Sequence, residues 1–274
     1  MPIEPLGLAQ ELAAAYANRE TIAVPPSKRE GGLDLSTAYA VDAELTRQRR
    51  AGGARTVGRK VGFANRALWR VFTLDTVLWA PMYDDTVHFA PAGTADLPLT
   101  TMIRPKIEPE IIFKLKRPPR GDPADPIEVL GAVEWLALGF EIVDCVFQDW
   151  KFQPADFVAA FGLHAGLIVG PPRPLEPAMI PALAEQLSAV KVRLTRNGAL
   201  IAEGTGANVL GSPALCLGEL AAGLARQAGA EPLAPRELIA TGALTDNQFI
   251  APDQAWTASL DGLELPDLTL RTTP

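Results

Sequence analysis

The run PKIEPEIIFKL, residues 105–115, combines a β-strand pattern with two acidic residues on one strand face. Glu108 and Glu110 alternate with apolar residues, and side chains two positions apart on a strand point to the same side of the sheet. Two like charges this close repel each other unless water or a cation separates them. The run therefore predicts a strand whose glutamate face is either solvated or lies beside a positive group. Pro109 removes a backbone donor, which predicts an edge strand or a bulge.

A cation is one explanation for the glutamate pair. Same-face residues on a strand lie roughly 6.5–7 Å apart at Cα, so both carboxylates can reach one hard cation. Glu141 lies in the apolar run LALGFEIVDCVF, and a buried unpaired carboxylate is costly. Either it forms a salt bridge with a distant residue such as Arg59 or Arg104, or it is a third ligand. Three oxygen donors suit Mg²⁺ or Mn²⁺ better than zinc. The residues alone leave both explanations open, and the ligands of the cation would be Glu108, Glu110 and Glu141.

Lys60 is a candidate catalytic residue in the run TVGRKVGF. On a strand, Gly58 and Gly62 share its face, which leaves open surface beside the ammonium for a small anionic ligand. An exposed lysine on a glycine-rich edge is the alternative. His164, in FGLHAGLIVG, is a second catalytic candidate, and a hydrogen-bonded core histidine is the alternative there. The run TGAL offers a hydroxyl and a glycine N–H that could hold a carboxylate, or it is an ordinary turn. The residues assigned to substrate binding are Arg59, Gly62, Gln148, Thr241 and Gly242.

The composition excludes several other classes of function. The 274-residue chain is 48% hydrophobic and 21% charged with a net charge of −7 and no basic stripe, so we expect no nucleic-acid partner. We find no apolar run that predicts a membrane span and no signal peptide at the N-terminus, and we expect a cytoplasmic protein. Cys145 and Cys216 are expected to be buried thiols. With only two histidines, His88 and His164, a histidine zinc site or a Ser-His-Asp triad is disfavoured.

The sequence pattern changes from helical to mixed strand and helix near residue 55. Residues 7–19 predict a helix, and Ser36 could cap a second helix that ends at Gly52-Gly53. After Thr56, strand-like runs alternate with turns, including an Asn197-Gly198 hairpin turn and a helix at 213–228. We predict a helical N-terminal segment, 1–54, followed by an α+β catalytic domain, 55–274.

The chain resembles the fumarylacetoacetate hydrolase superfamily, in its branch of 2-hydroxypentadienoate hydratases and 4-oxalocrotonate decarboxylases. The matching segments, in the order and spacing of the family, are GRKVGF (58–63), PKIEPEI (105–111), AVEWLALGFEIVDC (132–145), TRNGALIAEGTGANVLGSPALCLGEL (195–220) and ELIATGAL (237–244). The resemblance implies a mixed, rolled β-structure with peripheral helices. It also implies a Mg²⁺ or Mn²⁺ ion held by Glu108, Glu110 and Glu141, with Lys60 at the substrate.

The resemblance implies a lyase that adds water to a 2-hydroxy-2,4-dienoate and forms a 4-hydroxy-2-oxo acid. Lys60, beside the cation and partly buried, is expected to have a lowered pKa and to move protons during enol–keto exchange. Decarboxylation of a 4-oxalocrotonate-like acid is the alternative. Hydrolysis of an acylpyruvate C–C bond is less favoured, because DFVAAFGLHAG carries no lysine where the hydrolases have one. A metal-stabilised scaffold without activity is a further alternative.

The resemblance leaves the substrate and the assembly open. Residues 160–164 read AFGLH where the hydratases usually read ADNAS, so the exact substrate is undecided. The implied partners are a small 2-oxo or 2-hydroxydienoate substrate, further copies of the chain in a homo-oligomer, and a partner enzyme of the same pathway.

Overall fold

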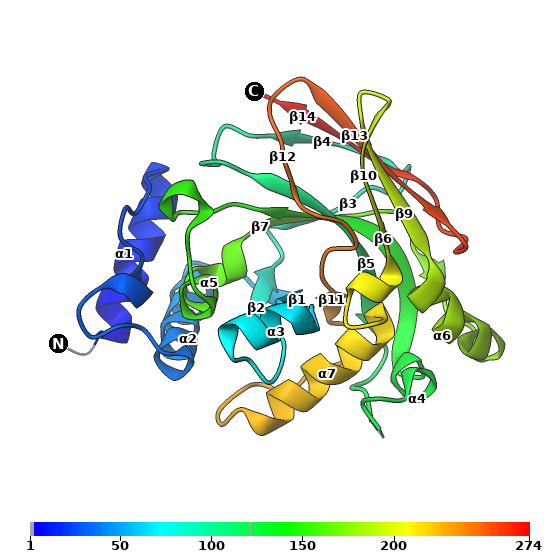
Figure 1. Ribbon diagram of the computed structural model, residues 1–274, viewed down its shortest axis with the longest axis horizontal. Coiled ribbons are helices and arrows are strands. Elements are labelled where there is room, and N and C mark those ends of the chain that lie inside the picture. Colours follow the sequence, from blue (N-terminus) through cyan, green and yellow to red (C-terminus); the bar gives the residue numbers. More distant parts are fainter. Residues whose placement is uncertain (1–2, 121) are drawn as a thin grey trace.

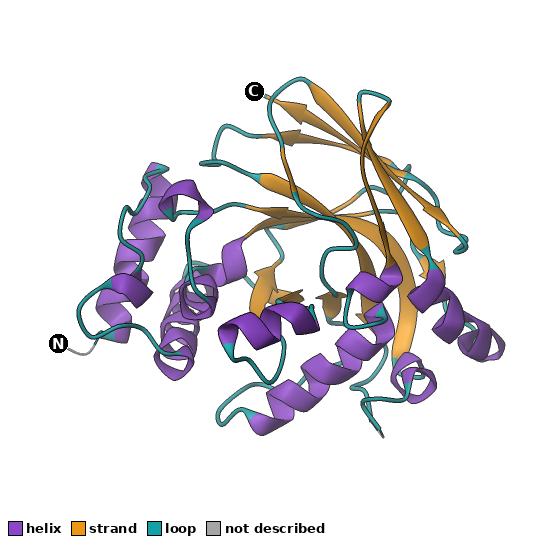
Figure 2. Ribbon diagram, in the orientation of Figure 1, coloured by secondary structure: helices purple, strands orange, loops and turns teal. Residues whose placement is uncertain are grey.

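The computed structural model describes residues 3–120 and 122–274 and has an α+β fold built on two curled β-sheets (Figures 1 and 2). The strands are β1 Thr56–Gly62, β2 Leu78–Tyr83, β3 Val87–Phe89, β4 Thr94–Pro98, β5 Lys106–Leu115, β6 Val133–Val143, β7 His164–Val169, β8 Arg173–Pro174, β9 Lys191–Arg196, β10 Ala199–Thr205, β11 Leu238–Ala240, β12 Gln248–Phe249, β13 Gln254–Asp261 and β14 Leu268–Thr273. Within the described residues, one sheet has the order β2-β1-β11-β5-β6-β7-β3, with β12 beside β5 and β8 beside β6. The other has the order β10-β9-β13-β14-β4.

Helices lie around the two sheets (Figure 1). They are α1 Pro5–Asn18, α2 Leu35–Ala51, α3 Arg66–Phe72, α4 Pro126–Leu130, α5 Pro154–Ala159, α6 Ile180–Ala189 and α7 Pro213–Arg226, joined in places by short 3₁₀ turns. In Figure 1, α1, α2 and α5 gather at the end of the molecule that lies away from the five-stranded sheet. This confirms the predicted fold class, a mixed rolled β-structure with peripheral helices.

The N-terminal helices have a hydrophobic cluster in common with the segment that follows β6. Leu12 and Leu45 are fully buried there, together with Phe147 and Val158. Asp34, rather than the predicted Ser36, caps α2, because its side chain accepts the N–H of Thr37. The domain boundary after residue 54 stays a prediction.

Strand β5 differs from the prediction made from Pro109, because it is a central strand. It pairs with β6 along its length, and on its other side it pairs first with β12 and then with β11. Between β11 and β12, residues 241–247 leave the sheet, and the Pro109 carbonyl accepts the N–H of Leu244 on that side. The N and O of one strand residue point to the same side, so the missing donor faces this excursion and costs no bond to β6. An interruption in the neighbouring strand therefore accommodates the proline.

Several smaller expectations are confirmed. Cys145 and Cys216 are free and buried. The Asn197-Gly198 turn joins β9 to β10, with both residues at positive φ.

One helical run is longer and more apolar than we predicted for any part of the chain. Gly206–Arg226 is long and apolar enough to cross a membrane by length and composition alone. However, 61% of its 18-residue apolar window is buried inside the protein. Gly223 of α7 in this run packs against Trp79, as expected of a core helix.

Candidate active site

The structure brings the three predicted metal ligands together on two neighbouring strands. Glu108 of β5 lies directly opposite Glu141 of β6. One carboxylate oxygen from each of Glu108, Glu110 and Glu141 lies within 4.8 Å of the others. Within the described residues, Oε1 of Glu110 and Oε2 of Glu141 are buried without a hydrogen-bond partner. Buried oxygens without partners are costly, and hard divalent cations bind such carboxylate oxygens, so these residues fit the expected metal.

Burial and mutual repulsion act on the carboxylates in different ways. Burial, Glu141 and Glu108 hold the pKa of Glu110 well above its usual range, although the Gly242 N–H donates to its Oε2 at 2.8 Å. Burial also raises the pKa of Glu108. For Glu141, burial raises the pKa, but Lys60 and His164 lower it by more, so the net shift is downward. Glu141 is thus the carboxylate most strongly held in its charged form.

Lys60 lies beside Glu141 and is 2% exposed. Its Nζ donates to the Gly162 carbonyl at 2.9 Å and lies 3.2 Å from Oε2 of Glu141, as an ion pair without hydrogen-bond geometry. Burial lowers the pKa of Lys60, but the charges of Glu141, Glu108 and Glu110 raise it by more. Among the protein side chains alone the net shift is upward, because three carboxylates outweigh the burial of one ammonium. The lowered pKa was predicted for Lys60 beside a bound cation, and it stays a prediction.

His164 connects the acidic cluster to a second group of polar residues. Its Nδ1 lies 3.1 Å from Oε1 of Glu141, and its Nε2 lies 2.9 Å from the hydroxyl oxygen of Thr86. The imidazole is held at both nitrogens, as expected of a residue that orients a metal-binding carboxylate. Together with Tyr16 and Arg49, His164 borders a cavity of about 230 Å³.

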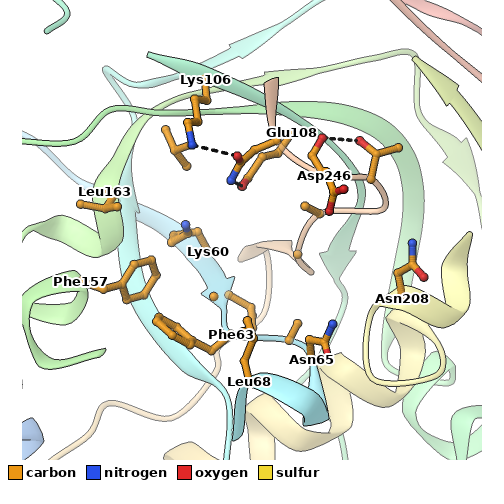
Figure 3. Close-up of a pocket in the computed structure, with 18 of the residues that line it drawn as sticks. Lys60, Phe63, Asn65, Leu68, Lys106, Glu108, Phe157, Leu163, Asn208 and Asp246 are labelled. Atoms are coloured by element: carbon orange, nitrogen blue, oxygen red, sulfur yellow. Dashed lines mark hydrogen bonds between the residues drawn. The ribbon is translucent and has the colours of Figure 1, made fainter. Parts of the chain in front are cut away.

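Glu108 and Lys60 line a larger cavity, of about 740 Å³ (Figure 3). Strand β1, helices α3 and α5 and the 241–247 excursion all contribute to its wall. One side is apolar and includes Phe63, Leu68, Phe72, Phe152, Phe157 and Leu163. The polar side includes Lys106, Asn208, Thr245, Asp246 and Asn247.

The residues predicted to bind substrate divide into two groups. Gly62 and Gly242 line the larger cavity. Arg59 points to the opposite face of β1 from Lys60, and its Nη1 pairs with Glu237 at 3.3 Å. Gln148 is exposed, and the Thr241 hydroxyl is buried and donates to the Ile111 carbonyl. The structure therefore does not place Arg59, Gln148 or Thr241 at the cavity.

Lys106 is a cavity residue that the sequence analysis missed. Its Nζ lies 4.0 Å from the centre of the Trp150 ring and 4.6 Å from that of Phe249, and it donates to Asn247 Oδ1 at 3.0 Å. It precedes Glu108 by two residues, so the same alternation that pairs the glutamates also places Lys106 on their face. That signal was available in the sequence.

Comparisons with known proteins add to this geometry. No family model matches the chain. It is 31% identical over 215 residues to a 2-hydroxypent-2,4-dienoate hydratase of Pseudomonas putida, covering 78% of this chain and 92% of the relative. It is 30% identical over 245 residues to a 4-oxalocrotonate decarboxylase of a Pseudomonas species, covering 89% of this chain and 90% of the relative.

Solved structures show the same likeness. The 4-oxalocrotonate decarboxylase from Pseudomonas putida G7, complexed with magnesium and adipate, superposes with a TM-score of 0.85 at 26% identity, covering 98% of this chain and 97% of that one. A fumarylpyruvate hydrolase from Pseudomonas aeruginosa shares the fold, with a TM-score of 0.59 at 15% identity, covering 79% of this chain and 89% of that one.

Proposed function

The chain belongs to the hydratase and decarboxylase branch of the fumarylacetoacetate hydrolase superfamily and is a metal-dependent lyase, and on that premise we propose that it adds water to a 2-hydroxy-2,4-dienoate. The product is a 4-hydroxy-2-oxo acid. The observation that supports this proposal most directly is the buried ion pair of Lys60 and Glu141 at the base of the larger cavity, next to two further carboxylates. That arrangement places a proton donor beside a site for the acid end of the substrate.

Glu108, Glu110 and Glu141 are the proposed ligands of the cation. When bound, Mg²⁺ or Mn²⁺ supplies Lewis-acid stabilisation of the negative charge that develops on the substrate's C2 oxygen. His164 holds Glu141 through Nδ1 and is itself held by Thr86 through Nε2, so it fixes the direction of that carboxylate.

Lys60 is the proposed proton-transfer residue. Its Nζ lies 3.2 Å from Oε2 of Glu141 and borders the larger cavity, so it can exchange protons with a substrate bound beside the carboxylates. The enol proton leaves the C2 hydroxyl and a proton is delivered to the end of the carbon chain, which gives the 2-oxo-3-enoate. Water then adds across C3 and C4, with its oxygen on C4 and its proton on C3. Phe157, 5% exposed and 4.9 Å from Nζ to ring centre, shields the ammonium from bulk water.

Decarboxylation of a 4-oxalocrotonate-like acid is the second candidate. It is favoured by the superposition with the decarboxylase structure over 98% of this chain. The same ligands and the same lysine serve both reactions, because both pass through negative charge at the C2 oxygen.

One NMR time course in D₂O separates the two reactions. The protein and Mg²⁺ are mixed with freshly made 2-hydroxypenta-2,4-dienoate, and separately with 4-oxalocrotonate. Hydration predicts that a 4-hydroxy-2-oxo acid forms from the first substrate and that Lys60→Ala slows it about 10²–10⁴-fold. Loss of CO₂ from the second substrate, with only deuterium exchange in the first, would instead make the protein a decarboxylase.

The assembly and location are also proposals. The family resemblance supports a homo-oligomer, an association with another enzyme of the same pathway, and a place in the cytoplasm. Light scattering after size exclusion measures the first directly, and a monomeric mass would contradict it.

A further inference from the structure

The larger cavity is much larger than a five-carbon acid requires. Its volume is about 740 Å³, while pockets of about 300–1,000 Å³ accommodate drug-sized ligands. Once the acid end of a dienoate lies near the glutamates and Lys60, most of this space remains beyond the reacting carbons. The residues that line that space indicate the chemistry of the substrate that it binds.

Four phenylalanines form a continuous row along one wall, in the order Phe152, Phe157, Phe63 and Phe72, and the row passes beside Lys60. The Phe157 ring centre lies 4.9 Å from Lys60 Nζ. Phe63 packs edge-to-face on Phe157 at 5.2 Å between ring centres, and Phe72 packs edge-to-face on Phe63 at 5.6 Å. Phe152 stacks on Phe157 at 6.5 Å. All four line the cavity, so we call them the aromatic row.

The backbone is adapted to hold these rings in place. A Cβ on Gly62 would lie 2.3 Å from Cζ of Phe157, so only glycine lets that ring lie against β1. Phe63 has a φ of 56° and Leu163 a φ of 58°, in the left-handed region that bulky residues rarely adopt. Backbone strain of this kind is concentrated at functional sites, where it holds side chains in working positions.

The wall beyond the reacting carbons holds little charge to match a second carboxylate. Lys60 and Lys106 are the cations that line the cavity in the described part of the chain. Lys106 lies between two aromatic rings and donates to Asn247, two residues along the strand from Glu108. It is therefore close to the acidic cluster rather than on the aromatic row.

We infer that the substrate carries a bulky apolar group, aryl or branched alkyl, on C5 of the 2-hydroxy-2,4-dienoate, packed against the aromatic row. This inference rests on the proposed function, because the acid end must lie at Lys60 and the glutamates. The apolar group lies beyond C4, so water still adds to C4 and the bond changes of the reaction are the same.

The test measures kcat/KM with Mg²⁺ for a series of dienoates that carry hydrogen, methyl, propyl or phenyl on C5. One additional methylene in a hydrophobic pocket changes kcat/KM about 10–200-fold, so we expect the phenyl compound to exceed the parent at least tenfold. A parent compound that is hydrated as fast as the phenyl compound overturns the inference and leaves the proposed function intact. The dienoate with a carboxylate on C5, 2-hydroxyhexa-2,4-dienedioate, is measured beside the series, and a higher kcat/KM for it than for the phenyl compound also overturns the inference. Hydration of none of the compounds overturns both.

A second experiment measures binding to the aromatic row in the absence of turnover. The saturated acids 2-oxo-5-phenylpentanoate and 2-oxopentanoate are titrated into the Mg²⁺-bound protein, with calorimetry as the readout. We expect at least tenfold tighter binding of the phenyl acid, and a reduction of that ratio at least fivefold in Phe72→Ala. Val71→Ala is the matched control on the same helix, since Val71 is 71% exposed and does not line the cavity. Equal binding of the two acids contradicts the inference.

Discussion

At the scale of single residues, the centre of the molecule is a set of charges that the protein alone does not balance. Glu108, Glu110 and Glu141 lie within 4.8 Å of one another, with one ammonium, Lys60, paired to Glu141. The fold therefore carries a repulsion that a divalent cation relieves. Removing one of these charges should have opposite effects on the metal-free and the metal-bound protein.

Glu110→Gln tests that balance. Burial raises the pKa of Glu110, so its ionised form opposes folding at neutral pH, and the amide removes this cost. Without metal, the variant is expected to melt ~2–4 °C higher, as for a gain of about 1 kcal/mol. With Mg²⁺, it should lose the stabilisation that the wild-type protein gains. Scanning calorimetry with and without Mg²⁺ measures both, and Glu185→Gln, on the exposed face of α6, is the control. A lower Tm without metal contradicts the argument.

His164 offers a second test, because the chain has one other histidine. His164→Asn removes the contact to Glu141, and loss of a residue that orients a ligand costs about 10–100-fold in metal affinity. Calorimetric titration with Mn²⁺ measures that loss. His88→Asn, on the exposed strand β3, should bind Mn²⁺ as the wild-type protein does. Unchanged affinity in His164→Asn would remove the positioning role.

At the scale of secondary-structure elements, alternation along a strand explains which site predictions agree with the structure. Period two places Glu108 and Glu110 together, and the structure has them so. The same period puts Arg59 on the opposite face from Lys60, and its assignment to the substrate neglected this. Pro109 was misread because an interruption in the neighbouring strand, between β11 and β12, cannot be read from one segment of sequence.

Helix α2 carries a buried carboxylate that feels the charge of Arg59 on β1. Asp42 is 8% exposed, its Oδ1 has no hydrogen-bond partner in the described residues, and burial, partly offset by Arg59, raises its pKa to about 7. The pKa of Asp42 is higher in the folded state than in the unfolded one. Its contribution to stability is therefore full below pH 4 and is lost as the pH rises through about 7.

Asp42→Asn should stabilise the protein in alkaline solution only. The expected gain is about 2–4 kcal/mol above pH 8 and falls towards zero near pH 4. Urea unfolding at pH 4.5 and pH 8.5 measures it, with the exposed Asp267→Asn as the control. An equal gain at both pH values would show that the carboxylate is not the cause.

At the scale of the whole molecule, folding and metal binding are coupled, because β5 and β6 both carry buried carboxylates into one cluster. Excess Mg²⁺ at about 100 times its Kd should add about 2.7 kcal/mol to the free energy of unfolding. A melting curve with Mg²⁺, and again after EDTA, measures the shift. A Tm that does not respond to either would contradict a structural contribution of the ion.

Contacts between segments that are distant in the sequence limit what this sequence could predict. The fold class was predicted from the helix, strand and turn patterns and from the ordered family segments. The same reasoning predicted that three glutamates meet at one site. The aromatic row was not foreseen, because its rings come from the residue after β1, from α3, from α5 and from the turn before α5, and no local pattern reports how distant segments meet. The exact substrate depends on that wall, which explains why the sequence left it open.

The separation of the two walls of the cavity has an evolutionary consequence. The glutamates lie on paired sheet strands, while the aromatic row lies on helices and connecting turns within residues 63–72 and 152–157. After a gene duplication, selection can therefore change the segments that carry the aromatic row while the glutamates keep their spacing. A lineage with this architecture can acquire new growth substrates through changes in its surface segments and inherit the reaction unchanged.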